Sequence, residues 1–169
     1  MLDLSPLESG EPRRITPQRP RDYLEILSRA VFNAGLSWQV VDARWPAIAA
    51  AFADFEPDVV AGYDDQDVER LLADERLIRS PKKLAAVPVN ARTLMGIVDE
   101  HDDVGRWLAG FAGYEASERG LRRAFRYIGE FGAYWTLYSI GAEVPDYREW
   151  AAARGRKLPP HLRGATATA

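Results

Sequence analysis

The 169-residue chain has no cysteine and only two histidines. The lack of cysteine excludes a disulfide framework and any metal site built from thiolates. Because a structural zinc site needs about four Cys and His ligands, we predict that the chain binds no zinc, and we expect no other cofactor. No apolar run reaches membrane-spanning length, and no signal-peptide pattern opens the chain. We therefore expect a cytoplasmic protein with no membrane partner.

Strand-like alternation of apolar and polar residues is absent over any useful length, and so is a long internal repeat. Apolar residues recur instead at three- and four-residue steps, as at Leu24, Leu27 and Val31. This spacing predicts an all-α fold, a single compact domain of roughly nine or ten short helices. We also expect the protein to be a monomer.

Positive charge is not in excess, because the net charge is −3. This balance argues against a protein that coats nucleic acid non-specifically, yet it allows a local basic face. Residues 1–19 carry proline and mixed charge without an apolar period, and we expect a mobile arm outside the core. The helical domain is then expected over 20–157, with a tail at 158–169.

The segment Ala34-Gly35-Leu36-Ser37-Trp38 joins two apolar helical stretches. Gly35 can end the first helix in a left-handed conformation without a steric penalty. Ser37 can accept a backbone N–H as the N-cap of the next helix. Trp38 would then lie in the first turn, either as a core anchor or as a ring that faces a cleft.

A second junction is Phe125-Arg126-Tyr127-Ile128-Gly129, preceded by Arg122 and Arg123. A tight turn followed by a helix start leaves N–H groups unpaired, and such groups can bind a phosphate oxygen. Gly129 allows close approach of a phosphate because it has no side chain. The alternative is an ordinary helical hairpin in which Glu130 interacts with the helix dipole.

Proline and serine predict where other helices break. Pro46 should interrupt the helix that follows Trp38, and Pro88 should kink the helix that has Ser80 as its N-cap and Pro81 as its first residue. Ser117 should cap the helix that leads into the hairpin.

Several motifs in order resemble the DNA-3-methyladenine glycosylase I family of helix-hairpin-helix repair enzymes. They are Ala34-Gly35-Leu36-Ser37-Trp38, Phe52-Ala53-Asp54-Phe55-Glu56-Pro57, Asp67-Val68-Glu69-Arg70-Leu71, Leu77-Ile78-Arg79, Lys83, Asn90-Ala91-Arg92 and Phe125-Arg126-Tyr127-Ile128-Gly129, with Gly141 beyond. The resemblance implies hydrolysis of the N-glycosidic bond of alkylated purines in double-stranded DNA with a flipped damaged base. It assigns backbone contacts to Tyr127, Ile128 and Gly129, with the arginines Arg122, Arg123 and Arg126.

The resemblance also assigns Trp38 to the base-binding pocket and places Ala30 where the family has its recognition glutamate. The family's zinc ligands and N-terminal pocket aromatics are missing as well, so we predict weak or absent release of 3-methyladenine. Ala30→Glu should then improve binding of that base if the pocket is otherwise intact. The alternatives are a non-catalytic DNA or damaged-base binding module, or an interaction protein that kept the scaffold.

Carboxylates that could act in place of the missing glutamate are few. Related glycosylases carry an aspartate after the hairpin, and Asp146 is the candidate here; the alternative is that Asp146, after Pro145, caps the last helix. Glu25 is predicted to be a solvated helix residue. A basic group, Arg79, Lys82, Lys83 and Arg92, either contacts phosphates or forms a solvated face.

Overall fold

The computed structural model describes residues 1–4 and 13–156, and over these residues it is helical without strands, which confirms the predicted all-α fold. The helices are α1 (Pro20–Asn33), α2 (Trp38–Ala51), the 3₁₀ helix η1 (Ala53–Phe55), α3 (Pro57–Ala61), α4 (Asp65–Ala73), α5 (Pro81–His101), α6 (Val104–Ala109), α7 (Tyr114–Ala124), α8 (Glu130–Ser139) and α9 (Tyr147–Ala153). Among them, none is both long and apolar enough to cross a membrane.

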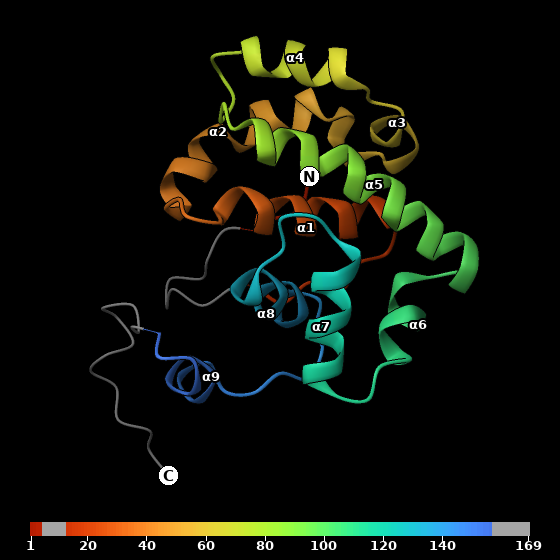
Figure 1. Ribbon diagram of the computed structural model, residues 1–169, viewed down its shortest axis with the longest axis vertical. Helices are drawn as coiled ribbons and strands as arrows, with labels where there is room; N and C mark the ends of the chain where they lie inside the picture. The colour runs from red at the N-terminus through yellow and green to blue at the C-terminus, as the bar shows by residue number, and fades with distance from the viewer. Residues whose placement is uncertain (5–12, 157–169) are drawn as a thin grey trace.

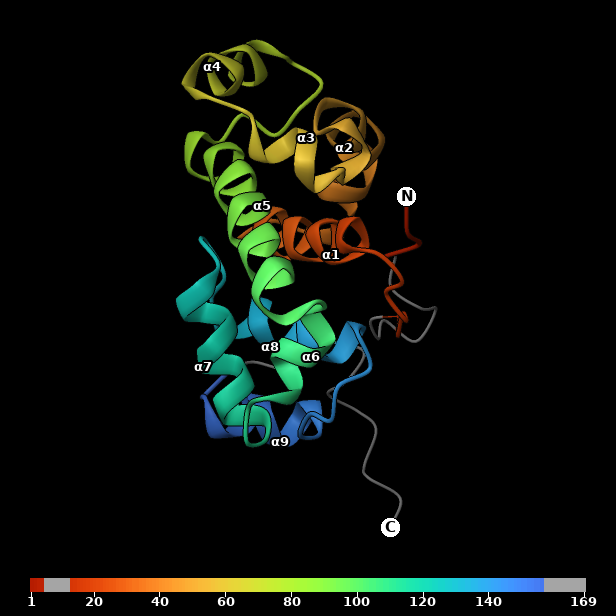
Figure 2. The same ribbon diagram turned by 90° about the vertical axis from the view of Figure 1, so that its right-hand side faces the viewer.

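Helix α1 lies at the centre of the molecule and is buried along nearly its whole length. It packs against α5 on one side and α8 on another, and α2 and η1 also contact it (Figure 1). The long helix α5 joins two groups of helices, with α2–α4 at one end and α6–α9 at the other (Figure 2). The two junctions singled out in the sequence, 34–38 and 125–129, both contact α5.

Two of the expected helix boundaries were wrong. Helix α2 continues through Pro46, whose exposed position lets water replace the hydrogen bond that proline removes. Helix α7 begins at Tyr114 because Gly113 takes a φ of +81°, and the Ser117 hydroxyl only donates back to the Gly113 carbonyl. Helix α5 runs from Pro81 to His101 as one helix that includes Pro88.

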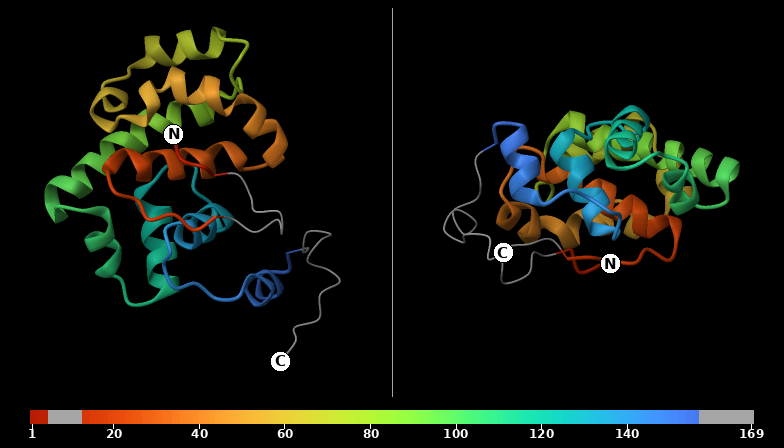
Figure 3. Two further views of the ribbon diagram at one scale, coloured as in Figure 1. Left: turned by 180° about the vertical axis from the view of Figure 1, so that it is seen from behind. Right: turned by 90° about the horizontal axis from the view of Figure 1, so that it is seen from below.

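The N-terminal residues are not all outside the core, contrary to the expectation for 1–19. Leu4 is 3% exposed and belongs to the hydrophobic core. Residues 13–19 run past α8 before they enter α1 (Figure 3), and the Ile15 amide donates to the carbonyl of Ser139. Part of this segment therefore contributes to packing. The predicted tail 158–169 lies outside the described residues.

The correction extends to Glu25, which is buried in α1 rather than solvated. Its carboxylate accepts hydrogen bonds from the Leu2 amide at 2.9 and 3.0 Å and from the Trp45 indole at 3.3 Å. Burial raises the pKa of Glu25, and these hydrogen bonds oppose the rise only in part. The side chain thus ties the first residues of the chain to the α1–α2 interface.

The raised pKa predicts a pH dependence of stability. The folded state holds the Glu25 proton more tightly than the unfolded state, so lowering the pH through the raised pKa should favour folding. This contribution is complete below the unfolded glutamate pKa of about 4.3 and is lost as the pH rises through the folded value. Urea unfolding across that range should show this component in the wild type and not in Glu25→Gln. Parallel pH profiles of the two proteins would contradict the prediction.

Aromatic side chains hold α9 against α8. The rings of Tyr134 and Trp150 lie 4.5 Å apart between centroids, and Tyr147 stacks on Trp150 at 5.8 Å. Trp150 is 1% exposed. Large buried rings contribute much packing energy, so this cluster stabilises the C-terminal helix.

Candidate functional site

The α1–α2 junction has the local structure that its residues predict. Gly35 has a φ of +76°, in the left-handed region that favours glycine. Ser37 is the N-cap of α2, and its hydroxyl accepts from the Val40 amide at 3.4 Å. Trp38 is therefore the first residue of α2.

Lys83 of α5 holds this junction in place. Its buried ammonium donates to the carbonyls of Phe32 and Ala34 at 2.7 and 2.6 Å, at the carbonyl end of α1. Burial lowers the pKa of Lys83. Helix C-termini favour such cations because their last carbonyls lack partners inside the helix. Lys83 thus acts as a structural cap.

Arg92 has a similar role at the end of α3, where its guanidinium donates to the carbonyls of Ala61 and Tyr63 at 2.8 and 3.3 Å. The four basic residues considered together in the sequence therefore divide into two kinds. Lys83 and Arg92 are bound to backbone carbonyls, whereas Arg79 and Lys82 are exposed.

Trp38 is half-buried and has an aromatic and a cationic neighbour. Its ring centroid lies 5.5 Å from that of Trp135 on α8. The guanidinium of Arg29, 1% exposed, lies 5.0 Å from the Trp38 ring and 4.8 Å from the Trp45 ring, and it pairs with Asp42. Burial lowers the pKa of Arg29, and Asp42 opposes this. The carboxylate one turn after Trp38 is thus engaged by a buried cation.

Ala30 does not line an open cleft. It is 5% exposed, and its Cβ lies 3.6 Å from the position that a Cβ at Gly132 would occupy. Helix α8 therefore covers this part of α1. At Ala30 itself the space is filled by the α1–α8 contact, and a glutamate there would need space that packing now occupies.

The hairpin joins α7 to α8 through residues 125–129. Tyr127 turns the chain with a φ of +60° and is exposed, whereas the Ile128 side chain is buried. Gly129 is the N-cap of α8 in an extended conformation, with no other atom of the described chain within 4 Å of a Cβ placed on it.

Asn90 of α5 fixes the hairpin backbone. Its Oδ1 accepts from the Arg126 amide at 2.6 Å, and its Nδ2 donates to the Arg126 carbonyl at 3.1 Å. The residue is 1% exposed. Since Lys83 is on the same helix, α5 holds both junctions, and the Lys83 ammonium lies 5.8 Å from the Tyr127 ring.

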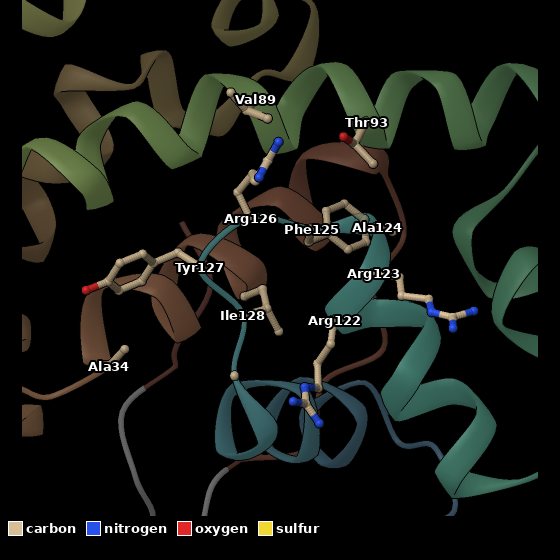
Figure 4. Close-up of a pocket in the computed structure, with 11 residues that line it drawn as sticks. Ala34, Val89, Thr93, Arg122, Arg123, Ala124, Phe125, Arg126, Tyr127 and Ile128 are labelled. Atoms are coloured by element: carbon tan, nitrogen blue, oxygen red, sulfur yellow. The ribbon is translucent and has the colours of Figure 1, made fainter.

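A groove of about 820 Å³ opens between the end of α1, the middle of α5 and the hairpin (Figure 4). Its lining includes Ala34, Val89, Thr93, and the hairpin with the end of α7. In this view Arg126 points toward α5, whereas Arg122 points toward α8. The arginines before and within the hairpin therefore diverge.

Ion pairs distinguish these arginines further. Arg122 pairs with Glu118 at 3.0 Å and with Glu130 at 3.7 Å. Within the described chain neither Arg123 nor Arg126 forms an ion pair. Their charge is consequently available to an anion, while that of Arg122 is largely balanced.

Asp146 is the N-cap of α9. Its carboxylate accepts from the amides of Arg148 and Glu149 at 2.8 and 3.3 Å, as the capping alternative expects. Among the described residues, no group of three or more His, Asp or Glu side chains is arranged to hold a metal ion.

Sequence reasoning did not assign roles to Asn90, Arg29 or Asp42. Asn90 is a polar residue beside the apolar positions Val87 and Ala91 in α5, which is the signal that could have identified it. Arg29 and Asp42 gave no such signal, because their pairing depends on how α1 meets α2.

Comparison with solved structures identifies the fold first. A crystal structure of 3-methyladenine DNA glycosylase I matches the fold with a TM-score of 0.65, 24% identity and coverage of 75% of this chain and 81% of that one. A structure of 3-methyladenine DNA glycosylase I from Staphylococcus aureus matches with a TM-score of 0.66 and 21% identity. The match covers 76% of this chain and 80% of that one.

Sequence comparison then gives the family. A family profile described as methyladenine glycosylase matches residues 16–130, and the chain belongs to this family. DNA-3-methyladenine glycosylase 1 of Escherichia coli (strain K12) is 40% identical over 63 residues, which are 37% of this chain. That stretch spans 34%, about a third, of the curated relative.

Proposed function

We propose that the protein is a base-excision repair glycosylase that binds double-stranded DNA through the hairpin and acts on alkylated purines. Family membership supports the reaction class, and the relatives are named for 3-methyladenine. Hydrolysis requires the damaged nucleotide to leave the stack, which costs least where the base is already damaged. The half-buried Trp38, next to Trp135, is the ring on which the flipped base would stack.

The observation that carries the proposal is the groove at the hairpin. The turn and the N-terminus of α8 offer backbone amides, and Arg126 adds an unbalanced charge beside them. Gly129 has neither a left-handed backbone nor a close neighbour in the described chain to explain why it is glycine. Close approach of a phosphate explains it.

A non-catalytic binding module is the second candidate, and the state of the candidate catalytic and base-binding positions favours it. Ala30 is packed against α8, Asp146 caps α9, and Asp42 is paired with Arg29. None of these carboxylates or positions offers a free acid to a cationic base.

Incubation with methylated duplex DNA separates the two candidates. Chromatography of the released bases should show an alkylated purine if the protein is an enzyme, and this release should fall in Trp38→Ala. Tight binding of the same duplex without release would support the binding module.

Gly129→Ala should weaken DNA binding more than it weakens the fold. Replacing glycine by alanine at an N-cap costs about 1 kcal/mol or less. Loss of a hydrogen bond to a charged phosphate should reduce affinity about tenfold. Equilibrium DNA binding and urea unfolding of the same variant provide the comparison. Unchanged affinity would exclude the α8 N-terminus as the phosphate site.

Arg126→Ala should reduce affinity for all DNA sequences alike and lower the salt slope by about 0.9, the value for one phosphate contact. Arg122→Ala should have a smaller effect, because Glu118 and Glu130 already balance its charge. Binding isotherms at several salt concentrations measure both variants. An equal loss in the two would contradict the distinction.

A further inference from the structure

A second pocket, of about 470 Å³, lies between α6 and α7. Trp107 and Phe111 form its aromatic side, and the basic residues are Arg119 and Arg123 on α7. Both rings are partly exposed. Pockets of this size suit ligands with an apolar body and a few polar groups.

The rings are held in fixed positions. Trp107 meets Phe111 edge-on at 5.0 Å and Phe125 edge-on at 6.1 Å. The tip of Phe111 fits against α7 at Gly120, where a Cβ would lie 2.4 Å from the ring. The aromatic surface is therefore preorganised, and little conformational entropy is lost when a flat ligand stacks on it.

Charge and position connect this pocket to the hairpin groove. In the described chain neither Arg119 nor Arg123 has a carboxylate partner, whereas the neighbouring Arg106 pairs with Asp102 at 2.9 Å. Arg123 and Ala124 line both the pocket and the groove. A flexible anion bound in the groove can thus continue along α7 into the pocket.

We propose that the pocket between α6 and α7 is a second subsite for a DNA strand. An unpaired base stacks on one of the two rings, Trp107 or Phe111, and meets the other at an edge, and the phosphates beside it bind Arg119 and Arg123. Stacked aromatic rings next to cations are the usual means of binding single strands without reading their sequence. The inference rests on the proposed function for its ligand class, but it requires no base to be released.

The test compares two single-stranded oligonucleotides of equal length and phosphate number, one of adenine nucleotides and one of a stable abasic analogue. The wild type should bind the adenine strand about tenfold more tightly, since stacking acts only on the base. Ala116→Leu, which fills the pocket, should remove most of this preference. Ala50→Leu, at an exposed position of α2, should retain it.

Arg119→Gln tests the phosphate contact without altering the rings. It should weaken both strands equally and lower the salt slope by about 0.7, the single-strand value for one phosphate. Arg106→Gln is the matched control and should change neither quantity, because Arg106 lies outside the pocket. Circular dichroism confirms that each variant is folded.

The outcomes separate this inference from the proposed function. If the strands bind equally well and Arg126→Ala weakens both, the hairpin contact stands and the α6–α7 subsite is wrong. A base preference that Trp38→Ala removes and Ala116→Leu retains also overturns it. Absence of binding to either single strand contradicts the α6–α7 subsite, whereas the proposed function fails only if duplex DNA is not bound. An acidic aromatic peptide that binds the pocket while the two strands bind equally would assign it to a protein partner instead.

Discussion

Ala30→Glu should destabilise the protein by about 3–5 kcal/mol, the usual cost of an unpaired charge inside a core. Ala30 is a buried residue of α1, on the side that packs against α8, and it faces Gly132 of that helix. A glutamate there must either bury its carboxylate or push α8 away. The variant should therefore lose stability before it can gain affinity for a cationic base.

Two control variants identify the cause of that loss. Ala30→Gln has the same size without the charge and should cost about 1–3 kcal/mol from overpacking alone. Ala34→Glu, one turn further along and exposed, should cost about 1 kcal/mol or less, mainly through the helix dipole. Urea unfolding at neutral and acid pH measures all three, and Ala30→Glu should recover part of its stability as the carboxylate is protonated. An Ala30→Glu protein of wild-type stability that binds 3-methyladenine would restore the original interpretation of this position.

Asn90→Ala should cost about 2–4 kcal/mol, because two buried hydrogen bonds are lost and the Arg126 amide and carbonyl are left without partners. The same change frees the hairpin backbone, so the amides at the start of α8 are no longer held in position. We therefore expect DNA affinity to fall as well, although Asn90 itself is buried.

Asn33→Ala provides the matched control. Asn33 is 9% exposed, and within the described chain neither atom of its amide group has a hydrogen-bond partner. Its removal should cost little, since an unsatisfied buried polar group contributes no net hydrogen bond. Chemical denaturation and DNA titration of both variants test the pair. Equal losses in the two would mean that Asn90 does not hold the hairpin.

The sequence predicted the junctions well because their signals are local. Gly35, Ser37 and Pro81 define helix ends through backbone geometry and short-range hydrogen bonds. For Asp146 the sequence left two roles open, a helix cap or a catalytic group, since the same residue type suits both. Its hydrogen bonds to the amides of α9 are the cap that one alternative expects.

Predictions for charged residues were less accurate, because burial depends on residues far apart in the chain. Lys83 donates to a carbonyl 51 positions away, and Glu25 accepts from an amide 23 positions away. No local pattern indicates such partners. The same limit applies to the arginines, which cluster in the sequence although Arg122 and Arg126 point apart in space.

The sequence by itself determined the fold class, the family resemblance and the two junctions that organise the site, because helix periodicity and turn chemistry act over a few residues. Tertiary structure alone decided that Ala30 is covered by α8, that Asn90 and Lys83 tie both junctions to α5, and that a second aromatic pocket lies beside the hairpin. These features depend on which helix faces come together, and that choice is made by packing of the whole core.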